Sequence, residues 1–224
     1  MSTRGRLICF TGIDGAGKTT LSKFLSERMT SQGVKYQYVY GRFLPVLVRP
    51  FWTVGKLLFL SSKDISGDYS EYTATKKTRL RNPLFARMHE FLLIFDYSLQ
   101  ILAKVTFPLL LGSNLVCDRY VYDTVITDLA PDLGYGDEKV LQMIKFCLAY
   151  MPKPDLVFLI DVPEGTSLQR KKDIPDIQYL TDRRGIYSKL KSDKNIVLLS
   201  GDLSLDENEH IVEATTLRLL ENLP

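Results

Sequence analysis

Residues 12–19 read Gly-Ile-Asp-Gly-Ala-Gly-Lys-Thr and match G-x-x-x-x-G-K-[ST], the pattern of a loop that binds phosphate groups. Its glycines let the backbone curl so that successive N–H groups point at an anion, and a following helix adds its positive N-terminal end. We expect Lys18 to reach the β- and γ-phosphates of a nucleoside triphosphate, and the Thr19 hydroxyl to ligate Mg²⁺. The residues predicted to hold the nucleotide are Gly12, Ile13, Asp14, Gly15, Ala16, Gly17, Lys18, Thr19 and Thr20.

A second group with chemical potential is Asp118-Arg119-Tyr120, which follows the apolar residues Leu-Val-Cys. An acidic residue at the end of such a strand is where phosphate-loop enzymes hold Mg²⁺, directly or through water. Arg119 beside it offers a bidentate fork to a second phosphate group. An ordinary Asp–Arg ion pair at a strand end is the alternative, and the loop upstream favours the functional interpretation.

The elements that must position these residues alternate between strand and helix along the chain. Strands are predicted over 7–11, 35–40, 114–118, 154–161 and 195–200, and helices over 19–31, 43–60, 84–111, 137–150 and 206–223, with Asp206 as an N-cap and a bend near Pro108. This order predicts an α/β fold in which a five-stranded parallel sheet carries helices on both faces. The loop, Arg42, Asp118 and Asp161 all fall at carboxyl ends of strands, where such sheets bind ligands.

Bulk composition limits the function classes. The chain has 224 residues and 45% hydrophobic content, which suits one domain with a sizeable core. A net charge of +3 is too small to favour a nucleic-acid or membrane-surface partner. Charges and prolines within the apolar stretches 43–60 and 91–111 favour packed helices over membrane spans. Three cysteines without metal-type spacing indicate a reducing compartment, hence the cytoplasm.

The chain resembles the thymidylate kinase family of nucleoside monophosphate kinases. The resemblance rests on the loop at 12–20, on Asp118-Arg119-Tyr120, on Pro152-Lys153-Pro154-Asp155 before the next strand, and on a basic segment near residue 170. It implies a three-layer kinase fold with a small lid, ATP and Mg²⁺ as cofactors, dTMP as acceptor, and a homodimer formed through helices on one sheet face.

The same resemblance assigns roles to individual residues. Asp14 is expected beside the acceptor, Lys18 and Thr19 on the donor's phosphates and metal, Asp118 near metal and acceptor, and Arg119 on the acceptor's monophosphate. Arg42, Phe95 and Thr124 complete the implied acceptor site.

One further cation is expected from the lid, at about residues 165–186. The family places an arginine either in the phosphate loop or in the lid, and Gly15 occupies the loop position here. Arg170 is therefore the predicted catalytic lid residue, with Arg183 and Arg184 as the next candidates.

The acceptor half departs from the family pattern. Asp96 appears near the expected base pocket, Ser98 and Leu99 stand where the family has an arginine three or four residues after the Phe, and Thr127 and Asp128 replace a Tyr-Gln pair. Residues 61–83 form a possible insertion. Two alternatives therefore stay open: a kinase acting on another nucleotide or a small phosphorylated metabolite, and a non-catalytic nucleotide-binding protein.

Overall fold

A computed structural model describes residues 4–46, 83–171 and 177–221. The predicted helix over 43–60 and the possible insertion over 61–83 lie almost entirely outside these residues.

Five strands in the described residues form one parallel sheet, in the order β2-β3-β1-β4-β5. Their bounds are β1 Leu7–Gly12, β2 Tyr36–Tyr40, β3 Asn114–Asp118, β4 Leu156–Asp161 and β5 Ile196–Ser200. β1 lies at the centre, and its Cys9 pairs in register with Cys117 of β3 and Val157 of β4. Because both faces of these strands are covered, β1 is buried along its whole length. The predicted fold class is confirmed, and both strand cysteines are fully buried core residues.

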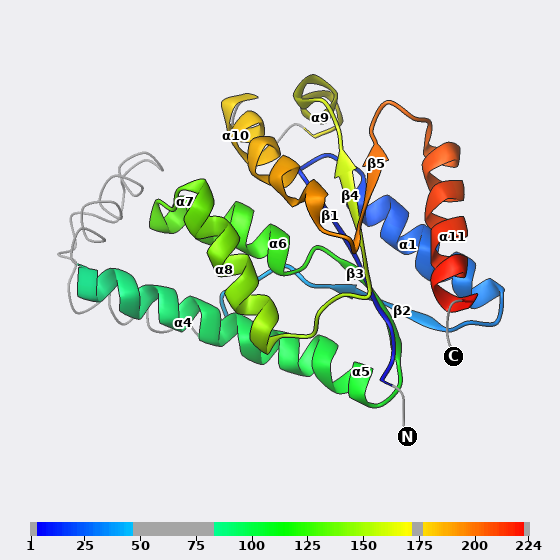
Figure 1. The fold of residues 1–224 in the computed structure, drawn as a ribbon, viewed down its shortest axis with the longest axis horizontal. Helices are drawn as coiled ribbons and strands as arrows, with labels where there is room; N and C mark the ends of the chain where they lie inside the picture. The colour runs from blue at the N-terminus through cyan, green and yellow to red at the C-terminus, as the bar shows by residue number, and fades with distance from the viewer. Residues whose placement is uncertain (1–3, 47–82, 172–176, 222–224) are drawn as a thin grey trace.

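Helices cover the two faces of the sheet (Figure 1). On one face lie α1 Lys18–Ser31 and α11 Leu205–Glu221, and on the other lie α4 Pro83–Ile101, α5 Phe107–Leu110 and α8 Asp137–Tyr150. After β3 the chain forms α6 Val121–Asp123, a π-helical segment Thr124–Leu129 and α7 Ala130–Leu133. Beyond the carboxyl ends of the strands lie α9 Glu164–Arg170 and α10 Ile177–Ser188, which occupy the expected lid region.

The long helical region on the second face continues past the predicted bend. A π-helical segment, Leu102–Thr106, separates α4 from α5, and Pro108 lies in the first turn of α5. Since proline has no N–H to donate to the preceding turn, a local change of hydrogen-bond pattern beside it is the expected response. Side chains four residues apart bury one face of this helix: Leu93, Tyr97, Ile101, Val105 and Leu109.

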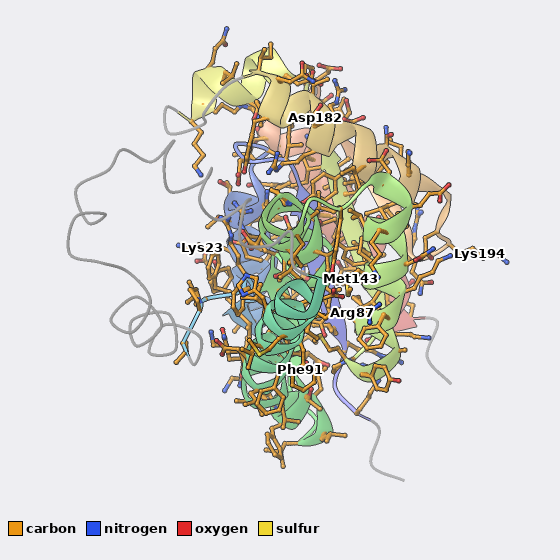
Figure 2. All side chains as sticks on the ribbon, turned by 90° about the vertical axis from the view of Figure 1, so that its left-hand side faces the viewer. Lys23, Arg87, Phe91, Met143, Asp182 and Lys194 are labelled. Atoms are coloured by element: carbon orange, nitrogen blue, oxygen red, sulfur yellow. The ribbon has the colours of Figure 1, made fainter. Side chains whose placement is uncertain are left out.

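The opposite face of the same helix is apolar but exposed. Phe91 and Phe95 stack with ring centroids 6.0 Å apart, and Leu99, Leu102 and Phe107 continue the exposed face. Figure 2 looks at α4 nearly end-on and labels Phe91 on it. Arg87–Leu110 is the one helix in the described parts of the chain that is long and apolar enough to cross a membrane, and a third of its most apolar window is buried.

The predicted N-cap of α11 was wrong by two residues. Ser204 caps this helix: its Oγ accepts a hydrogen bond from the Glu207 N–H, and the Glu207 carboxylate accepts from the N–H and hydroxyl of Ser204. This reciprocal pair is a capping box, which satisfies two groups that a helix start leaves without partners. Asp206 lies inside the first turn, where its charge faces the helix's positive end.

Candidate functional site

The phosphate loop connects β1 to α1 and holds its lysine close. Gly15 and Gly17 adopt left-handed backbone angles, φ 80° and 95°, which let the chain turn into the helix. The Lys18 ammonium donates to the carbonyl oxygens of Gly12 and Ile13 at 2.7 and 2.8 Å, and the side chain is only 3% exposed. Burial lowers the pKa of Lys18 to about 8, although Asp123 opposes this effect.

Asp118 and Thr19 form the part of the site suited to a metal ion. The Thr19 hydroxyl donates to Asp118 Oδ2 at 2.6 Å, and the Tyr38 hydroxyl donates to the same oxygen at 2.9 Å. Asp118 is fully buried, and its Oδ1 has no hydrogen-bond partner among the described residues. A buried carboxylate oxygen without a partner, next to a threonine hydroxyl, fits a hard cation such as Mg²⁺. No cluster of three or more acidic, histidine or cysteine ligands occurs in the described part of the chain.

Asp14 and Arg119 meet across the loop. Arg119 Nη2 donates to Asp14 Oδ1 at 2.5 Å, and both side chains are buried. Burial would raise the pKa of Asp14, but Arg119 and Lys18 outweigh it and hold that pKa well below its usual range. Arg119 Nη1 is buried without a hydrogen-bond partner in the described structure, so the guanidinium retains a donor for an anion.

Asp123 is a site residue that the sequence analysis missed. It lies on α6 and is fully buried, and it accepts hydrogen bonds from Thr11 at 2.7 Å and from Tyr187 at 3.1 Å. Its Oδ1 lies 3.7 Å from Lys18 Nζ and 3.8 Å from Arg119 Nη1. Burial raises the pKa of Asp123, and the two cations oppose that rise. Lys18 of the phosphate loop and Arg119 after β3 therefore lie close to the same carboxylate.

One face of α10 turns toward this centre. Tyr179, Arg183 and Tyr187 follow one another at four-residue spacing, which places them along one side of a helix. The Tyr179 hydroxyl donates to Asp14 Oδ2 at 3.2 Å, and Tyr187 donates to Asp123. Arg183 stacks over the Tyr179 ring, 3.4 Å from its centroid, and its buried Nε has no hydrogen-bond partner in the described residues. This arrangement brings Arg183 to the edge of the site, in addition to Arg119.

The three candidate lid arginines have different surroundings. Arg170 is exposed at the end of α9. Arg184 is held in ion pairs with Asp161 at 2.6 Å and Glu164 at 2.9 Å. Only Arg183 joins the residues around Asp14, through Tyr179. Both helices of the region touch the loop, because the Ser167 hydroxyl of α9 also donates to the Asp14 carbonyl.

Arg42, the predicted second acceptor arginine, forms an ion pair with Asp128, a residue that departs from the family pattern. Its Nη2 lies 2.6 Å from Asp128 Oδ1, and its Nε lies 3.2 Å from both carboxylate oxygens. Gly41 before it packs on the Arg119 backbone, where a side-chain carbon would lie 2.4 Å from the Arg119 carbonyl oxygen. The Arg42–Asp128 pair therefore lies beside Arg119. The hydrogen bond to Asp128 raises the pKa of Arg42, and the nearby negative charge of Asp14 contributes to this rise.

The remaining predicted acceptor residues are less directly connected to this centre. Thr124 is fully buried, and its hydroxyl accepts from the Phe43 N–H at 3.3 Å. Phe95 is half exposed on the outer face of α4, stacked on Phe91, so the structure does not bring it to Arg119. Asp96 on the adjacent face accepts from the Val46 N–H at 3.0 Å, and thus holds the chain that follows Arg42.

No family model matches this chain, whereas curated proteins of known name do. It is 30% identical over 176 residues to the probable thymidylate kinase of Pyrococcus horikoshii, a match covering 75% of this chain and 71% of that protein. It is 28% identical over 214 residues to probable thymidylate kinase 1 of Saccharolobus solfataricus, covering 93% and 94% of the two chains. It is 27% identical over 220 residues to the probable thymidylate kinase of Methanocaldococcus jannaschii, covering 97% and 96%. The chain therefore belongs to the thymidylate kinase family, whose members are nucleoside monophosphate kinases.

Proposed function

We propose that this nucleotide kinase transfers the γ-phosphate of ATP to a nucleoside monophosphate, with dTMP as the favoured acceptor and Mg²⁺ as the metal. The observation that carries the proposal is the position of Lys18 and Arg119, one from each half of the site. Each has a nitrogen within 4 Å of the same oxygen of Asp123. Phosphoryl transfer requires two phosphate groups to meet among cations, and these two side chains supply cations from opposite sides.

The donor would lie in the loop Gly12–Thr20, with its phosphates on the backbone N–H groups and on Lys18. Lys18 would exchange its bonds to two loop carbonyls for bonds to phosphate oxygens. Thr19 and Asp118 would hold the metal ion, which when bound neutralises charge on the donor's phosphates. The buried, unpartnered oxygen of Asp118 supports this assignment.

The acceptor's phosphate would bind Arg119 beside Asp14 and Arg42, because Arg119 Nη1 has no hydrogen-bond partner among the described residues. No strong general base is needed, because a monophosphate oxygen is already an anion. The depressed pKa of Asp14 agrees with a role in orienting Arg119 and the acceptor rather than in accepting a proton. Thr124 and Phe95 remain predictions for the rest of the acceptor site.

The proposed lid covers about residues 165–186 within a single domain. In this lid, Arg183 is a better candidate for the catalytic cation than Arg170. Three alanine variants, at Arg170, Arg183 and Arg184, decide between them. We expect Arg183→Ala to lower kcat by ~10³ with a small change in ATP affinity, since an arginine on the transferring group acts in the transition state. Arg184→Ala breaks two surface ion pairs and serves as the matched control. A loss of kcat confined to Arg170→Ala would instead identify Arg170, the residue predicted from the sequence, as the catalytic cation.

The acceptor itself is tested with a panel of monophosphates and radiolabelled ATP. The proposal expects the highest kcat/KM with dTMP and no turnover without a divalent metal. A different nucleotide or a small phosphorylated metabolite is the second candidate, favoured by the carboxylate of Asp128 on Arg42. If another acceptor exceeds dTMP, that second candidate replaces the first. A protein that binds Mg·ATP and phosphorylates none of the panel would contradict both.

The state of the protein in solution completes the proposal: a cytoplasmic homodimer formed through the exposed apolar face of α4. Its exposed members include Phe91, Phe95 and Leu99, and contiguous apolar surface of this kind is typical of protein interfaces. Light scattering of the purified protein measures the mass directly, and a monomer at micromolar concentration would exclude this assembly.

A further inference from the structure

Asp123 is placed so that it can act on both halves of the site at once. It is fully buried, and Lys18 and Arg119 are buried as well, with 3% and 8% of their surface exposed. Two buried cations in one neighbourhood repel each other and lose hydration, and a carboxylate between them offsets both costs. Asp14 does not serve the two cations in the same way, because its carboxylate accepts hydrogen bonds directly from Arg119 and from the Tyr179 hydroxyl.

The contacts of Asp123 divide into two kinds. Two hydroxyl groups hold it by hydrogen bonds, from Thr11 on β1 to Oδ2 and from Tyr187 on α10 to Oδ1. Lys18 Nζ and Arg119 Nη1 lie 3.7 and 3.8 Å from Asp123 Oδ1, which is beyond hydrogen-bond distance. The carboxylate is therefore fixed by neutral donors, and it takes no N–H group of Lys18 or Arg119 for a hydrogen bond of its own.

We propose that Asp123 is a positioning residue: a shared counter-ion that holds Lys18 and Arg119 at the separation which donor and acceptor phosphates require. The inference rests on the proposed function, since it assumes that these two cations bind the two substrates. Asp123 would contact neither substrate and would act through the two side chains that do.

The test is Asp123→Asn, which keeps the shape of the side chain and removes its charge. Calorimetry measures the dissociation constants of a non-hydrolysable ATP analogue with Mg²⁺ and, separately, of dTMP, and steady-state assays give both KM values. We expect both dissociation constants to rise about tenfold, the size of losing one interaction with a charged group, and kcat to fall as well.

Two further variants separate positioning from folding. Asp155→Asn is the matched control, because Asp155 also bridges two cations, Arg4 at 3.0 Å and Arg6 at 3.1 Å, at the opposite end of the sheet. It should lower thermal stability and leave both dissociation constants unchanged. Tyr187→Phe removes one hydrogen bond that fixes Asp123 without changing any charge, and should raise both constants about threefold. It keeps the test informative if Asp123→Asn does not fold.

The outcomes are distinct. A rise in both constants for Asp123→Asn and Tyr187→Phe supports the proposal. Unchanged or tighter binding, or a rise for one ligand alone, overturns it while leaving the proposed function intact. A merely structural role would reduce the active fraction, and hence kcat, with both KM values unchanged. If the wild-type protein fails to bind either ligand, the proposed function falls, and this inference falls with it.

Discussion

Replacing Gly15 by alanine adds one methyl group at the contact between the phosphate loop and α9. Gly15 has φ 80°, a backbone angle that costs a residue with a side chain about 1–2 kcal/mol. The added carbon would also lie 2.8 Å from both the carbonyl oxygen and the hydroxyl oxygen of Ser167. The hydroxyl can rotate away, but the carbonyl belongs to the backbone of α9 and moves only if that helix moves.

The two effects can be added. Overpacking of a tight contact costs about 1–3 kcal/mol, so Gly15→Ala should cost about 2–5 kcal/mol in all. For a chain of this size each kcal/mol lowers Tm by about 2–4 °C. Gly33→Ala isolates the backbone term, because Gly33 has φ 86° and nothing within 4 Å of the added carbon. It should cost only about 1–2 kcal/mol.

Thermal and denaturant unfolding of the two variants give the comparison, and the difference between them is the cost of the contact. If α9 shifts to make room, Gly15→Ala should also lower kcat, whereas Gly33→Ala should leave it unchanged. Equal losses of stability in the two variants would refute the close approach of α9 to the loop. The same result would remove the physical reason for glycine, rather than a cation, at position 15.

Two other predictions concern single residues. Burial lowers the pKa of Lys18 from 10.5 to about 8. Between these two pH values the unfolded chain therefore holds a proton that the folded protein has lost. The free energy of unfolding should rise with pH through this window. Phosphate groups need the charged ammonium, so Mg·ATP binding at pH 9 should take up close to one proton, measured by calorimetry in buffers of different ionisation enthalpy; no uptake would contradict the shift. Ser204→Ala should cost about 1 kcal/mol through the lost cap of α11, and Asp206→Ala less. A larger loss for Asp206→Ala in urea unfolding would contradict the capping box.

The strands and the donor half of the site could be predicted because their signals are local. Apolar runs of five or six residues mark strands covered on both faces, and the spacing of glycines, lysine and threonine in 12–19 marks the loop. The cap at Ser204 was also readable, since Ser-x-x-Glu precedes the helix. Asp206 is an ambiguous signal, because an acidic residue close to a helix start suits both the N-cap and the first turn.

The contacts that define the rest of the site join residues far apart in the chain. Asp123 meets Tyr187, 64 positions later, and Arg42 meets Asp128, 86 positions later. Nothing in a single sequence says which carboxylate faces which arginine. One signal was available: Tyr179, Arg183 and Tyr187 repeat at four-residue spacing within the lid. That pattern indicates a helix face, and in the structure this face of α10 carries Arg183 toward Asp14, whereas Arg170 ends the separate helix α9.

The backbone of Arg119 has a cost of its own. Its φ is 66°, and it is the one residue other than glycine with a positive φ in the described ranges. Neighbouring strands hold it there, through its N–H on the Phe10 carbonyl and the close packing of Gly41. Glycine at this position would relax the backbone by about 1–2 kcal/mol, but it would leave the buried carboxylate of Asp14 without its ion-pair partner, a loss of about 3–5 kcal/mol. A library sorted only for thermal resistance should therefore retain this arginine, because its charge contributes more to the stability of the fold than its backbone angle costs.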